Sequence, residues 1–269
     1  MSDPAILQRL VADLESETEA LGALLRELDP DDWSRQTPSV GWTIHDQVSH
    51  LAFFDDACAL AVTCPDQYRH ERDALVARGD DFPDQVAQDL RALDVTALRG
   101  WFRQARRHLL DVLGSADGST RIPWYGPDMN MTSAATARLM ETWAHGRDIA
   151  DAVGAEQPAT DRLRHIAHLG VRTRAFSFAL RNRSAPDSPI RVELTAPSGA
   201  VWGWGPEEAA DRVTGPAEDF CLVVTQRRHL DDTRLRSTGD AAGGWLDIAQ
   251  AFAGAPGPGR PASTPLTSR

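Results

Sequence analysis

Four of the eight histidines in this 269-residue chain stand four residues after an aspartate or a glutamate. The four pairs are Asp46/His50, Asp66/His70, Glu141/His145 and Asp161/His165. On an α-helix, side chains four residues apart differ in direction by only about 40°, so such an acid and imidazole can bind one metal ion. Chance alone predicts about one such pair in a chain with 39 acidic residues, and acid–histidine pairs also stabilise helices without a metal. Spacing therefore marks candidate ligands without choosing among the pairs.

The neighbouring residues narrow the choice. Glu141 and His145 lie in a strongly apolar stretch, and so does His50. A charged group that faces a core needs a partner, because an unpaired buried charge costs several kcal/mol. His70, by contrast, lies in a charged stretch that we expect to face water. His45 is five residues before His50, or about 140° around a helix, so we do not expect these two histidines to bind the same ion.

The elements that must position these residues are predicted to be helices. Apolar residues recur with a period near 3.6 over five stretches, which are 6–28, 43–62, 84–113, 132–153 and 160–180. Thr43 and Asp46 form a capping-box pattern at the start of the second helix. Gly154 is a usual C-cap for the fourth. The sequence therefore predicts a mainly α protein built on a bundle of four or five helices.

The character of the chain changes after Arg183. Residues 184–189 are rich in serine and proline and are predicted to be a linker. Strands are expected at 190–195, 201–204 and 233–237, and helices at 216–226 and 241–253. We therefore predict three parts, which are a helical bundle over 1–183, a small α+β domain over 190–253, and a mobile Gly/Pro-rich tail over 254–269.

Composition excludes several classes of protein. The net charge of −11 argues against nucleic-acid binding, which needs clustered positive charge. No apolar run approaches the roughly 20 residues of a transmembrane helix, and residues 1–4 lack a secretion-signal pattern. The three cysteines form no CxxC pair, which is typical of a reducing compartment. We expect a cytoplasmic protein without a membrane or nucleic-acid partner; the sequence gives no basis for an oligomeric state.

Two motifs resemble those of a known family. Residues 41–51 read GWTIHDQVSHL, which resembles the second-helix motif of the DinB-like superfamily and, more narrowly, of the mycothiol-dependent maleylpyruvate isomerase family. Residues 141–150 read ETWAHGRDIA, which resembles that family's second metal motif, Glu-x-x-x-His followed by Asp. The order and separation of the motifs also fit. The likeness covers about 1–180, and a weaker one to a wyosine-base-formation domain lies around 220–253.

The resemblance implies a metal site and a second active-site group. One divalent metal, expected to be zinc, would be held by His50, Glu141 and His145. Three protein ligands leave a coordination position open, as in catalytic sites. The family also places an arginine of the C-terminal domain at its active site, for which Arg227 and Arg228 are the candidates. The alternative interpretation of either is an exposed arginine at a helix end.

Two further features have two possible interpretations each. Asp148 could orient a metal ligand, or it could form a salt bridge with Arg147 or Arg138, which we favour. The loop 123–127, which carries one tryptophan and one tyrosine, could line the pocket or could simply pack.

The function implied by the resemblance is activation of a small thiol, mycothiol, as a thiolate that attacks a small electrophile. Addition to a conjugated double bond, rotation and elimination would give cis–trans isomerisation, and loss of a leaving group would give S-transfer. The alternative is a non-catalytic, metal-binding stress-response or binding protein of the DinB-like kind. A role in tRNA modification, suggested by the C-terminal likeness, is disfavoured by the acidic net charge.

Overall fold

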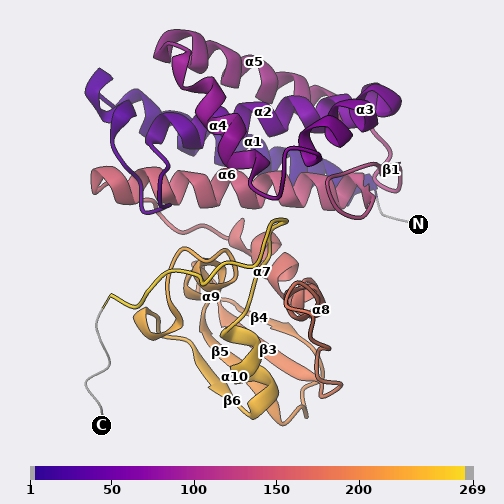
Figure 1. Cartoon of the computed structure of the whole chain (residues 1–269). Coiled ribbons are helices and arrows are strands. Elements are labelled where there is room, and N and C mark those ends of the chain that lie inside the picture. Colours follow the sequence, from indigo (N-terminus) through magenta and orange to yellow (C-terminus); the bar gives the residue numbers. More distant parts are fainter. Residues whose placement is uncertain (1–3, 264–269) are drawn as a thin grey trace. The chain divides into compact units, whose positions relative to one another are not determined.

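The computed structural model describes residues 4–263. These residues form two compact units, which divide between Gln157 and Pro158. Figure 1 shows that the first unit is helical and that the second contains a β-sheet with helices. No helix in the described part of the chain is long and apolar enough to span a bilayer.

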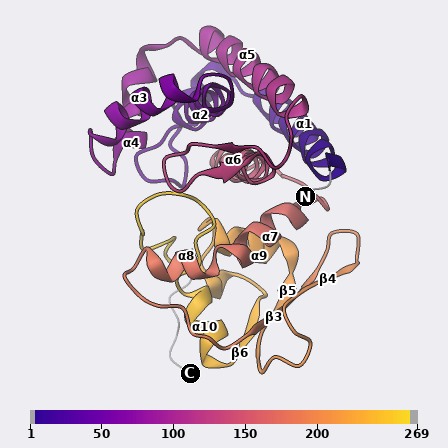
Figure 2. The same cartoon turned by 90° about the vertical axis from the view of Figure 1, so that its right-hand side faces the viewer.

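Six α-helices make up the first unit. They are α1 (Pro4–Arg26), α2 (Ile44–Thr63), α3 (Pro65–Val76), α4 (Phe82–Asp89), α5 (Val95–Gly114) and α6 (Met131–Val153). The long helices α1, α2, α5 and α6 form the bundle, with α2 packed on α5 and α6, and α1 packed on α6 and α5. Figure 2 views α2 and α6 nearly end-on. A two-stranded ribbon of β1 (Arg121–Ile122) and β2 (Met129–Asn130) leads into α6.

Local signals set the ends of the two helices that carry the candidate ligands. The Thr43 side chain accepts a hydrogen bond from the Asp46 N–H, and the Asp46 carboxylate accepts one from the Thr43 N–H at 2.8 Å. This confirms the predicted capping box at the start of α2. Gly154 adopts a left-handed conformation with φ of 68° and ends α6, as predicted.

The predicted helix over 84–113 is divided in two. A 3₁₀ turn, Leu90–Ala92, separates α4 from α5. The Asp94 carboxylate caps the new start, because it accepts hydrogen bonds from the N–H groups of Thr96 and Ala97. An N-cap bond of this kind satisfies otherwise unpaired amides and so favours a fresh helix start over a continuous helix. Together with α3, which begins at Pro65, the break raises the helix count of the unit to six.

Apolar stripes of the long helices meet in one core. Its buried members come from α1, α2, α5 and α6 and from the turn before α2, and they include Leu21, Leu25, Trp33, Ile44, Val48, Leu51, Leu98, Phe102 and Ile149. These positions repeat at helical spacing, so the hydrophobic effect fixes which face of each helix points inward.

A buried ionic cluster also connects three of these helices. Asp55 on α2 is fully buried, and its two carboxylate oxygens face Arg106 of α5 at 2.7 Å and Arg138 of α6 at 3.0 Å. Both arginines are themselves buried. Charges removed from water in this way need close partners, so the cluster fixes the register of α2 against α5 and α6.

The second unit is a small mixed sheet with four helices. The strands are β3 (Ile190–Thr195), β4 (Val201–Trp204), β5 (Asp211–Pro216) and β6 (Arg236–Thr238), in the order β4-β3-β5-β6. The central pair β3 and β5 is parallel, and the outer pairings are antiparallel. The helices are α7 (Leu163–Arg172), α8 (Arg174–Ala179), α9 (Ala217–Val224) and α10 (Asp240–Leu246). The predicted mainly α fold with a C-terminal α+β part is confirmed.

Strand β5 was not predicted, although β3 and β4 were predicted with their observed bounds. Its sequence, DRVTGP, contains a single buried apolar residue, Val213, and therefore lacks the alternation that marks a strand. Pairing with β3 on one side and β6 on the other supplies its hydrogen bonds instead.

The boundary between the units lies earlier than the linker predicted at 184–189. Helices α7 and α8 belong to the second unit, where α7 packs on α9. The predicted bundle domain over 1–183 therefore includes two helices whose apolar faces are buried in the α+β part. The predicted mobile tail also makes contacts over its described part, since the Gly257 carbonyl accepts from Arg181 and the Ser263 N–H donates to Asp232. Residues 264–269 lie outside the described residues.

Replacing Gly170 with alanine should destabilise the protein by about 1–3 kcal/mol, although alanine favours helix. A Cβ at this position of α7 would stand 2.8 Å from Val224 and 3.1 Å from Phe220 on α9. The matched control is Gly100→Ala on α5, where a Cβ meets nothing within 4 Å; it should stabilise by up to about 1 kcal/mol. Urea unfolding of the full chain measures both, and equal effects of the two changes would contradict the close packing of α7 on α9.

Candidate metal centre

His50 of α2 meets Glu141 and His145 of α6. Each residue offers one ligand atom, and these atoms all lie within 4.8 Å of one another. The Glu141 Oε2 atom is 3.0 Å from His145 Nε2 and 3.5 Å from His50 Nε2. The two imidazole centroids are 4.4 Å apart. Within residues 4–263 this is the one group of three or more acidic, histidine or cysteine side chains close enough to share a metal ion.

In the other three acid–histidine pairs, the acid forms an ion pair or a hydrogen bond with a group outside the pair. Their partners are Arg91 for Asp46, Arg69 for Asp66, and the Ser198 N–H for Asp161. His45 points away from the cluster, as its spacing predicted, and its Nε2 atom lies 2.8 Å from the Leu93 carbonyl. The structure therefore makes the choice that spacing alone left open.

The protonation states of the cluster suit a divalent cation. Burial, followed by the effect of the neighbouring His145, lowers the pKa of His50 to about 4, so this imidazole is neutral at pH 7. Burial alone would raise the pKa of Glu141, but hydrogen bonds with His145 and His50 outweigh it and hold that pKa well below its usual range. A neutral imidazole and an ionised carboxylate are the forms that bind metals. Two nitrogens and one oxygen form a donor set that zinc accepts.

Sequence reasoning missed Gln47. Its side-chain Oε1 is hydrogen-bonded to His145 Nδ1, and its amide nitrogen donates to Thr37 Oγ1 at 2.8 Å. Gln47 is fully buried. It precedes His50 by three residues, or one helical turn, so the shared face of the helix was the signal that could have found it.

Asp148 has a contact that the sequence did not suggest. Its carboxylate accepts a hydrogen bond from the Ser39 hydroxyl at 3.0 Å, so it ties α6 to the loop before α2. Arg138, one of its expected salt-bridge partners, pairs with Asp55 instead.

Aromatic rings enclose the two histidines. Trp42 stacks on His145 with centroids 5.9 Å apart and meets His50 edge-on at 5.2 Å. The Phe54 ring, one turn after His50, lies 4.5 Å from it. The Trp42 indole N–H donates to Asp84 on α4 at 2.6 Å, which holds the indole beside the cluster. These rings give the candidate site an apolar wall.

The loop 123–127 belongs to the same wall. The Tyr125 and Trp124 rings lie 5.4 and 6.4 Å from Phe54, and Tyr125 also stacks on Phe82 at 5.1 Å. Trp124 stacks on the buried Tyr68 with an interplanar angle of 4°. The loop therefore lies one ring away from His50, and its aromatic residues both pack and border the site.

Arg227 and Arg228 follow α9 in the second unit. Their guanidinium groups donate to backbone carbonyls nearby, Arg227 to Thr225 at 2.8 Å and Arg228 to Arg227 at 2.7 Å. Because the metal ligands belong to the first unit, a role for either arginine beside them stays a prediction.

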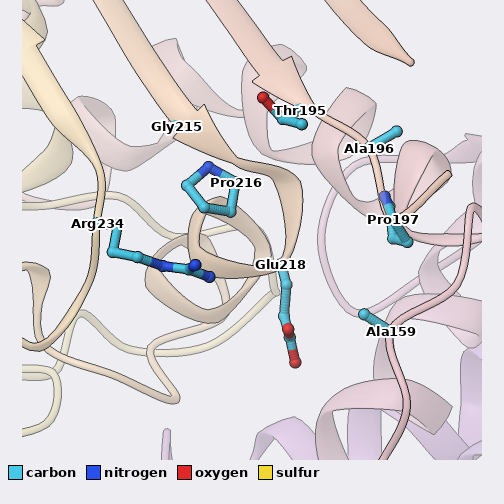
Figure 3. Close-up of a pocket in the computed structure, with 8 residues that line it drawn as sticks. All are labelled: Ala159, Thr195, Ala196, Pro197, Gly215, Pro216, Glu218 and Arg234. Atoms are coloured by element: carbon cyan, nitrogen blue, oxygen red, sulfur yellow. The ribbon is translucent and has the colours of Figure 1, made fainter. Parts of the chain in front are cut away.

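A separate cavity of about 350 Å³ lies in the second unit, at the carboxyl ends of the parallel strands β3 and β5. Figure 3 shows two charged side chains at it, Glu218 and Arg234. Arg234 is already paired with Asp219 at 3.2 Å. The remaining lining is small or apolar and consists of Ala159, Thr195, Ala196, Pro197, Gly215 and Pro216. This lining has no histidine or cysteine, so the cavity differs in chemistry from the histidine cluster.

Two of the three cysteines are buried and are not expected to serve as nucleophiles. Burial raises the pKa of the Cys58 thiol to about 12, and burial also raises that of Cys221 well above its usual value, whereas Cys64 is exposed. Because thiolate is the reactive form, a chromogenic aromatic disulfide should titrate one thiol in the folded protein and all three after unfolding. Cys64→Ser should abolish the reaction of the folded protein; fast reaction of a second thiol would contradict the burial of the other two.

Comparison with known proteins places this geometry in a family. Residues 14–150 match the family described as the mycothiol maleylpyruvate isomerase N-terminal domain. The matched range includes all three clustered side chains. Residues 186–238 match a family described as wyosine base formation, a match that begins well before the likeness noted around 220–253.

Similar proteins support the same assignment. Two uncharacterised proteins of Mycobacterium tuberculosis, from strains CDC 1551 and H37Rv, are each 47% identical over 260 residues, covering 97% of this chain and 100% of theirs. Crystal structures of a mycothiol-dependent maleylpyruvate isomerase and of its histidine-to-alanine mutant share the fold, with a TM-score of 0.59 at 15% identity over 88% of this chain and 95% of theirs. The two motifs, the helical bundle that joins them and these matches agree: the chain belongs to the family of the mycothiol maleylpyruvate isomerase N-terminal domain.

Proposed function

We propose that this chain is a divalent-metal-dependent enzyme that activates a small thiol, mycothiol, as a thiolate for attack on a small electrophile. The observation that carries the proposal is the convergence of His50, Glu141 and His145, with their ligand atoms within 4.8 Å of one another. Membership in a family named for a mycothiol-dependent isomerase supports the choice of thiol. Zinc is the expected metal.

The charge of the ligand set favours a thiolate. Histidines bind a metal in their neutral form, and Glu141 is ionised, so the three side chains contribute one negative charge as ligands. A bound dication would leave a net positive site with an open position, and it would lower the pKa of a thiol held there. The aromatic wall of Trp42 and Phe54 limits water beside the histidines, which strengthens this attraction.

The sulfur then reacts as a nucleophile. Its electron pair forms a C–S bond to a conjugated alkene carbon, and the π electrons move onto the conjugated carbonyl. Rotation about the former double bond, which is now single, and expulsion of the thiolate as the C–S bond breaks restore the alkene as its geometric isomer. If a leaving group departs with the electrons of its bond instead, the product is a thioether. Arg227 or Arg228 is proposed to hold an anionic group of the electrophile.

Metal analysis and turnover assays test the proposal together. The purified protein should contain about one divalent metal, and the metal-loaded protein should convert maleylpyruvate or a related unsaturated acid when mycothiol is added, but not with glutathione alone. Chelation should abolish the activity. Arg227→Met or Arg228→Met should raise KM more than it lowers kcat, because the arginine would bind the ground state and the transition state alike.

The same assays test the alternative function, that of a non-catalytic metal-binding protein. Stoichiometric metal without thiol-dependent turnover of any electrophile tested would favour a non-catalytic metal-binding protein of the DinB-like kind. Absence of metal from protein purified without chelator, together with failure to bind added Zn²⁺, would overturn both functions.

A further inference from the structure

We infer that Gln47 is a positioning residue, whose side-chain amide holds His145 as the tautomer that carries its proton on Nδ1 and leaves the Nε2 lone pair free for a metal. The inference rests on the proposed metal site and adds to it a specific residue outside the three ligands. It follows from the direction of a chain of hydrogen bonds that links His145, Gln47, Thr37 and Trp42.

The direction of these hydrogen bonds is set at the Trp42 end of the series. The Trp42 carbonyl can only accept, and the Thr37 hydroxyl lies 2.8 Å from it. The hydroxyl has a second neighbour, the Ser39 carbonyl at 3.5 Å, which also can only accept. The single hydroxyl proton of Thr37 is therefore given to a backbone carbonyl, and its oxygen is left to accept from Gln47.

That requirement orients the Gln47 amide. The Thr37 oxygen needs a donor, so the NH₂ group of Gln47 faces it, at 2.8 Å. The other end of the amide, Oε1, then faces His145 Nδ1. A carbonyl oxygen only accepts, so Nδ1 must carry the proton. The Nε2 atom of the same ring faces the Glu141 oxygen 3.0 Å away; a metal bound there takes the Nε2 lone pair, and the one N–H that the ligated imidazole keeps is the Nδ1–H that Gln47 accepts.

Burial makes this orientation costly to reverse. Gln47 is fully shielded from solvent and His145 is 6% exposed. Rotating the amide would place an NH₂ group against an N–H and a carbonyl oxygen against the Thr37 oxygen, so buried donors would lose their acceptors. The series of hydrogen bonds therefore favours the tautomer of His145 that has its proton on Nδ1.

His50 differs from His145 in this respect. Among the described residues, its buried Nδ1 atom has no hydrogen-bond partner. Ring packing against Trp42 and Phe54 orients it instead. Metal-binding histidines usually donate their second ring N–H to an oxygen, which fixes the ring and raises its basicity. In this site Gln47 performs that role for one of the two imidazoles.

Zinc affinity and histidine NMR test the inference on the same samples. Gln47→Leu should weaken Zn²⁺ binding, measured by competition with a chelating dye, by about 10–100-fold. Proton–nitrogen spectra of the zinc-loaded protein should show the Nδ1 proton of His145 protected from exchange with water, and Gln47→Leu should speed that exchange. Thr37→Val should weaken binding less, and Thr37→Ser should bind as the unchanged protein does.

Two further variants separate positioning from a general effect on folding. Gln47→Glu keeps an oxygen against Nδ1 and should retain the affinity to within about tenfold, even if Gln47→Leu folds poorly. The matched control is Gln250→Leu, which removes another buried amide, hydrogen-bonded in the second unit. It should lower stability without changing Zn²⁺ affinity.

The outcomes distinguish this inference from the proposed function. If His145→Ala loses Zn²⁺ but Gln47→Leu binds it within twofold and keeps the Nδ1 proton of His145 equally protected, the positioning role is overturned while the metal site stands. If His145→Ala binds Zn²⁺ as tightly as the unchanged protein, the metal site is overturned, and the role of Gln47 with it.

Discussion

Replacing His50 with alanine should lower the affinity of the protein for Zn²⁺ by at least about tenfold. His50 is the one member of the cluster that comes from α2, and its Nε2 atom lies 3.5 Å from the Glu141 oxygen. Without it, Glu141 and His145 would form a two-ligand site on a single helix, and two ligands bind zinc much less tightly than three. Calorimetry of the metal-free protein with Zn²⁺ measures the change.

The matched control for this substitution is His70→Ala. His70 also follows an acid by four residues on a helix, but it is exposed on α3, and its acid, Asp66, pairs with Arg69. The control should leave Zn²⁺ affinity unchanged. Full metal occupancy in His50→Ala would contradict the ligand assignment and would remove the basis for thiol activation at this site.

Replacing Asp55 with alanine should destabilise the protein by about 3–5 kcal/mol. The carboxylate accepts hydrogen bonds from Arg106 and Arg138, whose side chains are only 2% and 3% exposed. Removal of the one acid leaves two buried positive charges without their partner, and the cost of that desolvation is no longer offset. Chemical unfolding, followed by circular dichroism of the full chain, measures the loss.

An exposed ion pair provides the control. Asp66→Ala removes the partner of Arg69 at the surface of α3, where the acid side chain is 99% exposed. Exposed ion pairs contribute little to the stability of a protein, so the stability of the Asp66→Ala variant should stay close to that of the unchanged protein. A loss in Asp55→Ala no larger than in this control would show that the buried cluster does not hold the helices together.

Much of the fold could be predicted from local sequence. The stripes of α1, α2 and α6 repeat at helical spacing, and the Thr43 capping box and Gly154 define ends because their hydrogen bonds and backbone angles involve only nearby residues. What could not be predicted depends on distant partners. Strand β5 has one buried apolar residue and is held by its neighbours in the sheet. Helix α7 joins the second unit because its surface fits α9.

By itself, the sequence determined that Glu141 and His145 share one face of one helix, since a spacing of four residues is a local property of the α-helix. It could not decide which acid–histidine pair would meet another histidine, nor that Gln47 would face His145. Only the tertiary structure decided these points, because distances between helices are set by how whole side-chain surfaces pack. The buried Asp55 cluster and the aromatic wall around Trp42 hold α2 against α6, and that packing brings His50 to the other two ligands.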